Sequence, residues 1–201
     1  RGRLLGTEDP AAAAAPEYNF ISQSFFLCWR AVHLGVISEV SQYRNHIRRL
    51  HHFHAGLATG DNQSVQALII KMLTDVYMLS PALVKDLLDF TVGACSSLSN
   101  LLGCGEDASS SSDAGDWTLP RSACSPVVLR LLTQIPEHLV TDLMEILLFV
   151  AKTQPSTLCS VDLSSVLALA VFFLRRPWAV TSPHLRARFG QVLYYIFLPV
   201  A

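Results

Sequence analysis

Apolar residues recur every three or four positions along most of the chain after Asn19, which is the spacing of amphipathic α-helices. Two stripes are the clearest, and the turn-forming residues 60–62 separate them. The first stripe comprises Val36, Val40, Tyr43, Ile47, Leu50 and Leu57. The second stripe comprises Val65, Leu68, Ile69, Met72, Leu73 and Val76. This pattern predicts two amphipathic helices joined by a turn.

Capping residues mark where several further helices should begin. Ser80-Pro81 and Ser182-Pro183 each place a hydroxyl before a proline that can occupy the first helical position. Residues 62–64 match the glycosylation triplet, but we interpret them as a helix start. Two more helices are predicted near residues 161–176 and 183–198.

The segment from Pro136 predicts another helix. Proline suits the first turn because its missing N–H has no helical partner there, and Glu137 places a carboxylate at the positive end of the helix dipole. The expected buried face consists of Leu139, Leu143, Ile146, Leu147 and Val150. No basic or nucleophilic residue stands beside Asp142 and Glu145 in the sequence, so we interpret them as a solvated helix face and not as an acid/base pair.

No segment alternates apolar and polar residues between turn signals as a β-strand would, so we predict an all-α fold. Short connections between paired amphipathic helices favour a bundle or an α-solenoid, although no repeat of fixed period is evident. Residues 1–18, with five consecutive alanines, are predicted to be a linker. The polar, serine-rich residues 103–120 are predicted to be a flexible loop inside a domain that covers residues 19–201.

The chain is poor in charged residues. Hydrophobic residues make up 51% of the 201 positions and charged residues 15%, against about 25% charged residues in an average soluble protein. We therefore expect a fragment of a longer protein, with some apolar faces covered by segments outside it. The formal charge of −1 gives no reason to expect nucleic acid or an anionic membrane as a partner.

The cysteines are odd in number and widely spaced, which favours reduced thiols in the cytoplasm or nucleus over a disulfide framework or a zinc site. They are Cys28, Cys95, Cys104, Cys124 and Cys159. The longest weakly polar run, Leu163–Leu174, is shorter than the roughly 20 residues of a membrane span. We therefore predict no membrane anchor.

A histidine- and arginine-rich stretch of the first amphipathic helix is the densest group of chemically capable side chains. It contains His46, Arg48, Arg49, His51, His52 and His54. His51 and His54 share a helix face, but no carboxylate or thiolate is placed to complete a metal site, and the nearby arginines would repel a cation. A polar helix face is the main interpretation. A second is that Arg44, Arg48 and Arg49 form a basic face for an acidic partner.

Sequence motifs of known catalytic chemistry are absent. The chain contains no phosphate-binding loop, no His-Glu-x-x-His, no Gly-x-Ser-x-Gly and no dinucleotide-binding glycine pattern. The main aromatic residues are interpreted as packing within or between helices, and they are Phe25, Phe26, Trp29, Phe172 and Phe173. We predict no catalytic, cofactor-binding or metal-binding residues in this chain, and no cofactor.

Three segments of the chain carry a recognisable combination of motifs. They are Asn19–Leu27 with Ala31–Gly35, Ile135–Asp142 with Ile146–Val150, and Ser182–Arg188 with Val192-Leu193. In this order they resemble the core of the ubiquitin chain-elongation factors of the ubiquitin-fusion-degradation type, which are U-box ubiquitin ligases. Ser182 stands where the family usually has asparagine, and residues 103–120 depart from the family pattern.

This resemblance implies an elongated, armadillo-like α-solenoid segment of paired amphipathic helices. The implied parent protein is a ubiquitin-protein transferase that extends ubiquitin chains on already modified proteins, in ubiquitin-dependent degradation that includes endoplasmic-reticulum-associated degradation. The family's U-box recruits the ubiquitin-conjugating enzyme and lies at the far C-terminus. It is expected outside this chain, so the chain alone is predicted to be inactive.

The resemblance also implies partners, namely a AAA-class segregase, ubiquitin-like shuttle receptors and ubiquitinated substrates, but it assigns none of them to residues. A generic helical-repeat interaction module without a ubiquitin role is the alternative, and everything except the three motifs supports it equally. A helical enzyme that uses the histidine cluster ranks third.

Overall fold

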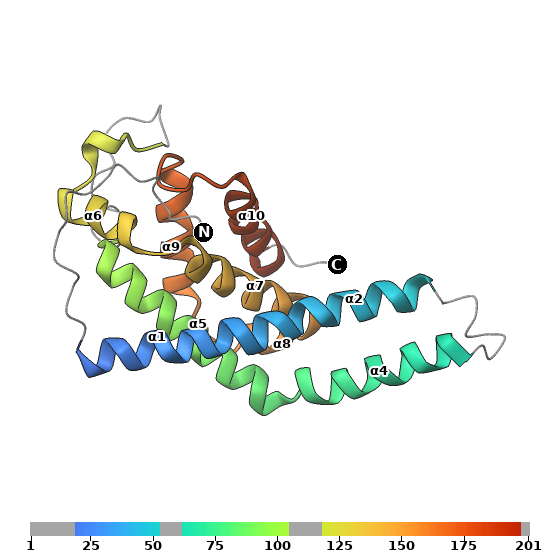
Figure 1. The fold of residues 1–201 in the computed structure, drawn as a ribbon. Helices are drawn as coiled ribbons and strands as arrows, with labels where there is room; N and C mark the ends of the chain where they lie inside the picture. The colour runs from blue at the N-terminus through green and yellow to red at the C-terminus, as the bar shows by residue number, and fades with distance from the viewer. Residues whose placement is uncertain (1–18, 53–61, 105–117, 198–201) are drawn as a thin grey trace. The chain divides into compact units, whose positions relative to one another are not determined.

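The computed structural model describes residues 19–52, 62–104 and 118–197, and these residues form helices and turns with no strand among them (Figure 1). The predicted all-α class is confirmed, while the armadillo-like arrangement stays a prediction. The chain divides into two compact units. The N-terminal unit is Tyr18–Leu87, and the C-terminal unit is described over residues 88–104 and 118–197. The predicted linker, 1–18, lies outside the described residues.

The N-terminal unit begins with one continuous helical stretch. It consists of α1 (Phe20–Val32), a π-helical turn η1 (His33–Ile37) and α2 (Ser38–His52). Asn19 caps its start, because the Asn19 side-chain oxygen accepts a hydrogen bond from the backbone N–H of Ser22 at 2.9 Å. The sequence predicted helical structure from Asn19 onward but gave no sign of the π-helical turn.

The helix α4 (Asn62–Met78) begins at Asn62, as the sequence predicted, and packs against α2 (Figure 1). Of the first apolar stripe, Val40 and Tyr43 are buried, whereas Leu57 lies outside the described residues. The second stripe is different, because most of it is exposed. The exposed members are Val65, Ile69, Met72, Leu73 and Val76.

The helix α5 (Pro81–Leu102) runs from the N-terminal into the C-terminal unit, and both of its ends have clear local causes. The Ser80 hydroxyl accepts a hydrogen bond from the N–H of Leu83 at 3.3 Å, which confirms the predicted cap. At the other end, Gly103 has a φ of 65°. The N–H of Cys104 then donates to the carbonyl of Ser99 at 3.0 Å, the closure of a Schellman motif that glycine permits.

The C-terminal unit is built around α7 (Glu137–Thr153), which is buried on nearly all sides from Leu139 to Ala151. The predicted buried face of α7 is confirmed in full, and the opposite face is buried as well. The remaining helices of the unit are α6 (Pro126–Gln134), α8 (Pro155–Leu158), α9 (Ser164–Arg175) and α10 (Pro183–Phe197), with a 3₁₀ turn at Arg121–Ala123. The sequence did not predict α6 or α8.

The C-terminal end of the predicted flexible loop contacts α9. Leu119 donates its N–H to the carbonyl of Arg175 at 2.7 Å, and the indole N–H of Trp178 donates to the carbonyl of Leu119 at 2.7 Å. Residues 105–117 lie outside the described residues, so the flexibility of that part stays a prediction. Leu119 itself is held by hydrogen bonds to the last residue of α9 and to the turn that follows it.

One helix of the described chain, Phe20–His52, is long and apolar enough by length and composition to cross a membrane. The bent pair Asn62–Met78 and Pro81–Leu102, with 58° between its helices, passes the same test together. Core helices of soluble proteins and signal sequences pass it too. Charged and polar residues interrupt Phe20–His52, so it contains no uninterrupted weakly polar run that the sequence could show. The absence of a membrane anchor stays a prediction.

Candidate functional site

The second and third motif segments meet in the C-terminal unit, where α7 packs against α10. The helix α10 begins at Pro183, as predicted, whereas α7 begins at Glu137 and Pro136 is the extended residue just before it. The backbone N–H of Leu185 donates to the Ser182 hydroxyl at 3.5 Å, which confirms the predicted cap of α10. We call the contact between the two helices the α7–α10 seam and define it by Glu145, Lys152, Arg188 and Tyr195.

The centre of the α7–α10 seam is an ion pair between the Glu145 carboxylate and the Arg188 guanidinium, 2.7 Å apart. The expectation that Asp142 and Glu145 form a solvated face was wrong, because their residues are only 3% and 8% exposed. The cause is tertiary. The helix α10 covers this side of α7 and supplies the cation that the local sequence lacked.

Further contacts hold the Arg188 side chain in place. Its Nε–H donates to Nε2 of His184 at 3.3 Å, and an Nη1–H donates to the side-chain oxygen of Gln191 at 3.3 Å. These partners lie one turn before and one turn after Arg188 on α10, so the guanidinium is oriented by its own helix. Glu145 is therefore engaged with a cation that has two further partners.

Aromatic contacts extend the seam to both sides. Phe173 of α9 stacks on Phe189 of α10 with ring centroids 5.3 Å apart and 21° between the planes. The Lys152 ammonium of α7 lies 4.7 Å from the centre of the Tyr195 ring on α10. The predicted packing role of Phe173 is confirmed, as is that of Phe172, which is also buried.

In the N-terminal unit the predicted packing of the aromatic residues is confirmed only in part. Trp29 is buried, and its ring meets that of Phe25 edge-on with centroids 5.3 Å apart. Phe26 is 40% exposed, although its ring contacts that of Phe25 at 5.6 Å. The sequence alone does not show that Phe26 is partly exposed, because its exposure depends on which helices lie beside it.

A pocket opens between α5 and the start of α9. It is lined by Asp89, Val92, Gly93, Ser96, Val161, Asp162, Ser164 and Ser165. The Ser164 N–H and hydroxyl both donate to the Asp162 carboxylate at 2.9 Å, which holds the pKa of Asp162 below its usual value. This carboxylate lies two residues before Ser164 and accepts the N–H of that residue, the first of α9.

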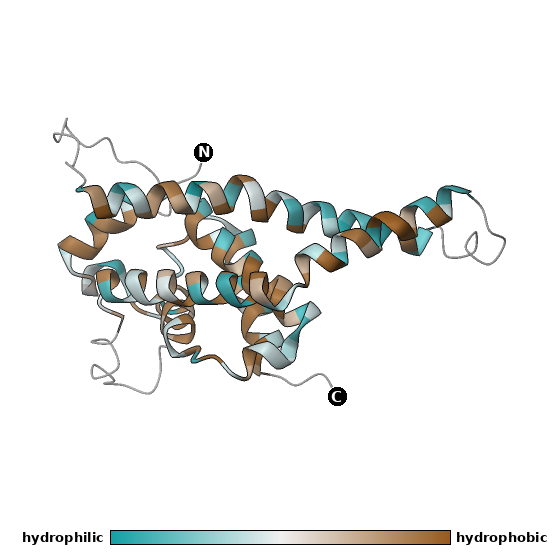
Figure 2. Ribbon diagram, turned by 90° about the horizontal axis from the view of Figure 1, so that it is seen from below, coloured by the Kyte–Doolittle hydropathy of each residue, from teal (hydrophilic) through white to brown (hydrophobic). Residues whose placement is uncertain are grey.

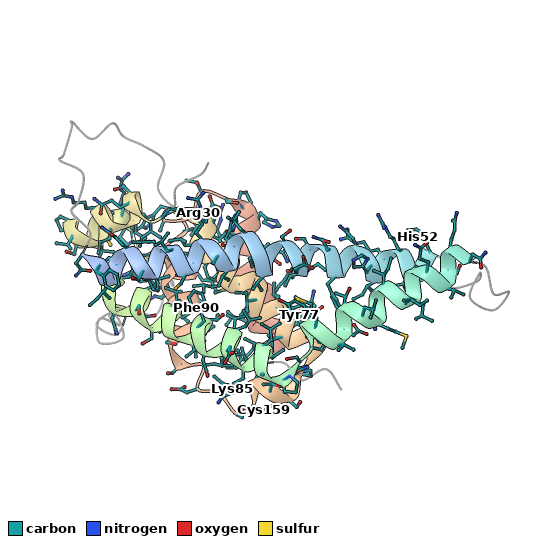
Figure 3. The ribbon with its side chains drawn as sticks, turned by 60° about the horizontal axis from the view of Figure 1, so that its bottom comes forward. Arg30, His52, Tyr77, Lys85, Phe90 and Cys159 are labelled. Carbon is teal, nitrogen blue, oxygen red and sulfur yellow. The ribbon has the colours of Figure 1, made fainter. Side chains whose placement is uncertain are left out.

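The histidine-rich stretch does not come together as one site within the described residues. His46 and Arg49 line a pocket between α2 and α4, whereas His51 and His52 are exposed at the end of α2, where Figure 3 labels His52. Among the described residues no group of three or more His, Cys, Asp or Glu side chains is placed to hold a metal ion. His54 lies outside those residues, so the absence of a metal stays a prediction.

A buried polar contact joins α2 and α4 and was not predicted from the sequence. The Tyr43 hydroxyl is hydrogen-bonded to Asp75, which also forms an ion pair with Lys71. Burial, together with the nearby Asp75 carboxylate, raises the pKa of Tyr43 to about 12. The one feature of the sequence that could have indicated this contact is the position of Tyr43 within an apolar stripe, because a buried tyrosine hydroxyl needs a hydrogen-bond partner.

The five cysteines are free thiols in the structure. Cys95 is fully buried in α5, and burial raises the pKa of its thiol to about 12. A thiol with so high a pKa is protonated at neutral pH and is a poor nucleophile. Cys28 and Cys159 are exposed, and the Cys159 thiol donates a weak hydrogen bond to the carbonyl of Pro155 at 3.7 Å.

The described chain is thus an all-helical framework whose charged and aromatic contacts join helices to one another. Residues 3–201 match the family described as ubiquitin elongating factor core, so the chain belongs to that family. This confirms the resemblance that the three motif segments suggested.

Among curated proteins, a probable ubiquitin conjugation factor E4 from Arabidopsis thaliana is 25% identical to the chain over 200 residues. The match covers 90% of the chain and 18% of the relative, so the chain spans less than a fifth of the length of that protein. No solved structure matches the chain.

Proposed function

We propose that this chain is a helical scaffold within a U-box ubiquitin-protein ligase that extends ubiquitin chains on already modified proteins. Membership of the ubiquitin elongating factor core family supports this proposal, and so does the similarity to a probable ubiquitin conjugation factor. The process served is ubiquitin-dependent protein degradation, in the cytoplasm and nucleus. The transfer chemistry belongs to a U-box outside these residues.

The observation that carries the scaffold role is the α7–α10 seam. Its charged side chains are occupied in helix packing, because the Glu145 carboxylate contacts Arg188 and the Lys152 ammonium contacts the ring of Tyr195. A buried carboxylate fixed by a guanidinium is a poor general base, whereas the same pair sets the register of two helices. This arrangement suits a rigid frame that holds other parts of a ligase apart at a defined distance.

The proposed partners follow from the family resemblance. A ubiquitin-conjugating enzyme would be recruited through the U-box, while a AAA-class segregase, ubiquitin-like shuttle receptors and ubiquitinated substrates would bind elsewhere on the parent protein. The residues described above assign none of these partners to a surface.

A reconstituted chain-extension reaction tests the proposal. It contains the activating and conjugating enzymes, ubiquitin and a ubiquitin-fusion substrate, with either the 201-residue chain or the full-length parent protein added. We expect the parent to lengthen chains and the 201-residue chain to add nothing to the background of the conjugating enzyme. A parent lacking residues 19–197 should lose chain extension.

Two results would contradict this proposal. One is chain growth with the 201-residue chain alone, which would place transfer chemistry inside it. The other is full activity of a parent protein without residues 19–197, which would leave the scaffold with no role. Arg188→Gln in the parent is the milder variant, and we expect it to reduce chain length without abolishing recruitment of the conjugating enzyme.

A further inference from the structure

The outward face of α4 is a continuous apolar stripe. Its residues follow steps of four, three, one and three along the helix, which places them on one side of it. They are Val65, Ile69, Met72, Leu73 and Val76, and their exposed fractions range from 40% to 78%. Figure 2 shows hydrophobic residues gathered along α4. Soluble proteins expose large apolar patches mainly where something binds.

This orientation of α4 is fixed by its other side. Ser64 and Met78 are buried, and the Tyr43 hydroxyl of α2 is hydrogen-bonded to Asp75 of α4. Turning the apolar stripe inward would break that bond and expose Met78. The helix is therefore held with its more apolar face away from α2.

The neighbouring part of α2 is positively charged. It carries Arg44, Arg48 and Arg49, and no acidic residue follows Glu39 in this helix. The facing half of α4, residues 62–70, carries no charged residue. The formal charge of the whole chain is −1, so the positive charge is local.

A pocket connects the positive charge to the apolar stripe. His46 and Arg49 of α2 line it together with Gln66 and Ile70 of α4. Ile70 is 36% exposed and lies next to the stripe on the helix surface. A ligand that covers the stripe can therefore reach Arg49 along the same side of the helix pair.

We propose that the apolar stripe of α4 is a docking surface for an amphipathic helix of a partner protein, whose carboxylates pair with Arg48 and Arg49. The stripe from Val65 to Val76 is about 17 Å long, or three helical turns, which matches the apolar ridge of one helix. The basic residues at one end select acidic flanks on that helix and speed the encounter at low salt. This surface is independent of the proposed scaffold role.

Two other occupants fit the observations less well. A second copy of the chain would offer no carboxylate to the arginines from its own stripe, because the only acidic residue of α4 is Asp75, which is engaged with Tyr43 and Lys71. A helix that lies on an anionic membrane carries basic residues beside its own apolar face. The only basic residue of α4 is Lys71, which is paired with Asp75.

The test uses the 201-residue chain and two labelled helical peptides of about three heptads, both with leucine at the a and d positions. One peptide has glutamate at the flanking e and g positions and the other has lysine. We expect the glutamate peptide to bind, with an affinity that falls as salt is raised, and the lysine peptide to bind at least about tenfold more weakly. Fluorescence anisotropy measures both.

Matched variants locate the binding. Leu73→Gln should weaken binding of the glutamate peptide about tenfold or more, while Leu101→Gln, at a similarly exposed leucine of α5, should not change it. The double variant Arg48→Gln/Arg49→Gln should lose the salt dependence, and Arg121→Gln/Arg130→Gln should keep it. Circular dichroism checks that each variant keeps its helicity.

Several results would overturn the proposal. They are equal binding of both peptides, binding of neither peptide, and equal losses in Leu73→Gln and Leu101→Gln. Light scattering that shows a dimer broken by Leu73→Gln, without peptide binding, would assign the stripe to a second copy. Binding to phosphatidylserine vesicles that Leu73→Gln abolishes, again without peptide binding, would assign it to a membrane surface.

Discussion

The helices α4 and α7 are both 17 residues long and both carry apolar residues at helical spacing, yet they meet different surroundings. In α7 nearly every side chain from Leu139 to Ala151 is buried, including Asp142 and Glu145. In α4 only Ser64 and Met78 are buried, and the apolar stripe is exposed. An apolar pattern therefore shows which residues favour burial, but not whether another part of the described chain packs against them.

The largest expected effect is on the stability of α7. Leu147 is fully buried, so Leu147→Ala removes packed methyl groups and leaves a cavity. We expect the free energy of unfolding to fall by about 2–5 kcal/mol. Denaturant titration followed by circular dichroism measures this change. A loss below about 1 kcal/mol would show that α7 is not a well-packed centre.

The second effect concerns the ion pair of the α7–α10 seam. Arg188→Met leaves the Glu145 carboxylate without its cation, and we expect a loss of about 2–3 kcal/mol because both groups are mostly buried. Glu145→Gln/Arg188→Met should recover part of this loss, since neither charge then remains uncompensated. Additive losses in the double-mutant cycle would show that the two groups do not interact in solution.

A smaller effect is expected where α4 packs on α2. Tyr43→Phe removes the hydroxyl bonded to Asp75 and should cost about 1 kcal/mol at neutral pH. The folded-state pKa of Tyr43 is about 12, above its ordinary value of 10.0. The stability from neutral Tyr43 is thus fully present below pH 10 and is lost as the pH rises toward 12.

The thermal midpoint should therefore fall more steeply between about pH 10 and 12 in the wild-type chain than in Tyr43→Phe. Lysine side chains titrate in both proteins, so the difference between the two curves isolates Tyr43. Identical pH dependence of the two proteins would contradict a buried Tyr43–Asp75 contact.

The smallest effect is predicted for the exposed stripe itself. Leu73→Ala should change the free energy of unfolding by no more than about 0.5 kcal/mol, because the side chain is 67% exposed. The matched control is Leu147→Ala in α7, measured under the same conditions. If the two variants lost similar stability, the stripe of α4 would be covered in solution and the contrast between the helices would disappear.

Much of the fold could be predicted from the sequence where local rules apply. Hydroxyl caps at Ser80 and Ser182 gave the starts of α5 and α10, and Pro136-Glu137 gave the start of α7. The two short helices α6 and α8 were missed, because nine and four residues are too few to show a clear helical period.

The interior of the candidate site could not be predicted in the same way. Glu145 looked like a surface residue because its partner, Arg188, is 43 positions away in the sequence and arrives on another helix. Sequence spacing relates residues one turn apart on the same helix, whereas contacts between helices depend on how the helices pack.

The amino-acid sequence by itself determined the all-helical class, the capped starts of the main helices and the motifs that place the chain in its family. These properties depend on backbone hydrogen bonds and spacings within a few residues. Only the tertiary structure decided that Glu145 is buried beside Arg188 and that the stripe of α4 faces outward. The burial of a residue depends on the elements packed around it. When a helix has apolar residues on several sides, its own sequence does not specify which side the neighbouring helices will bury.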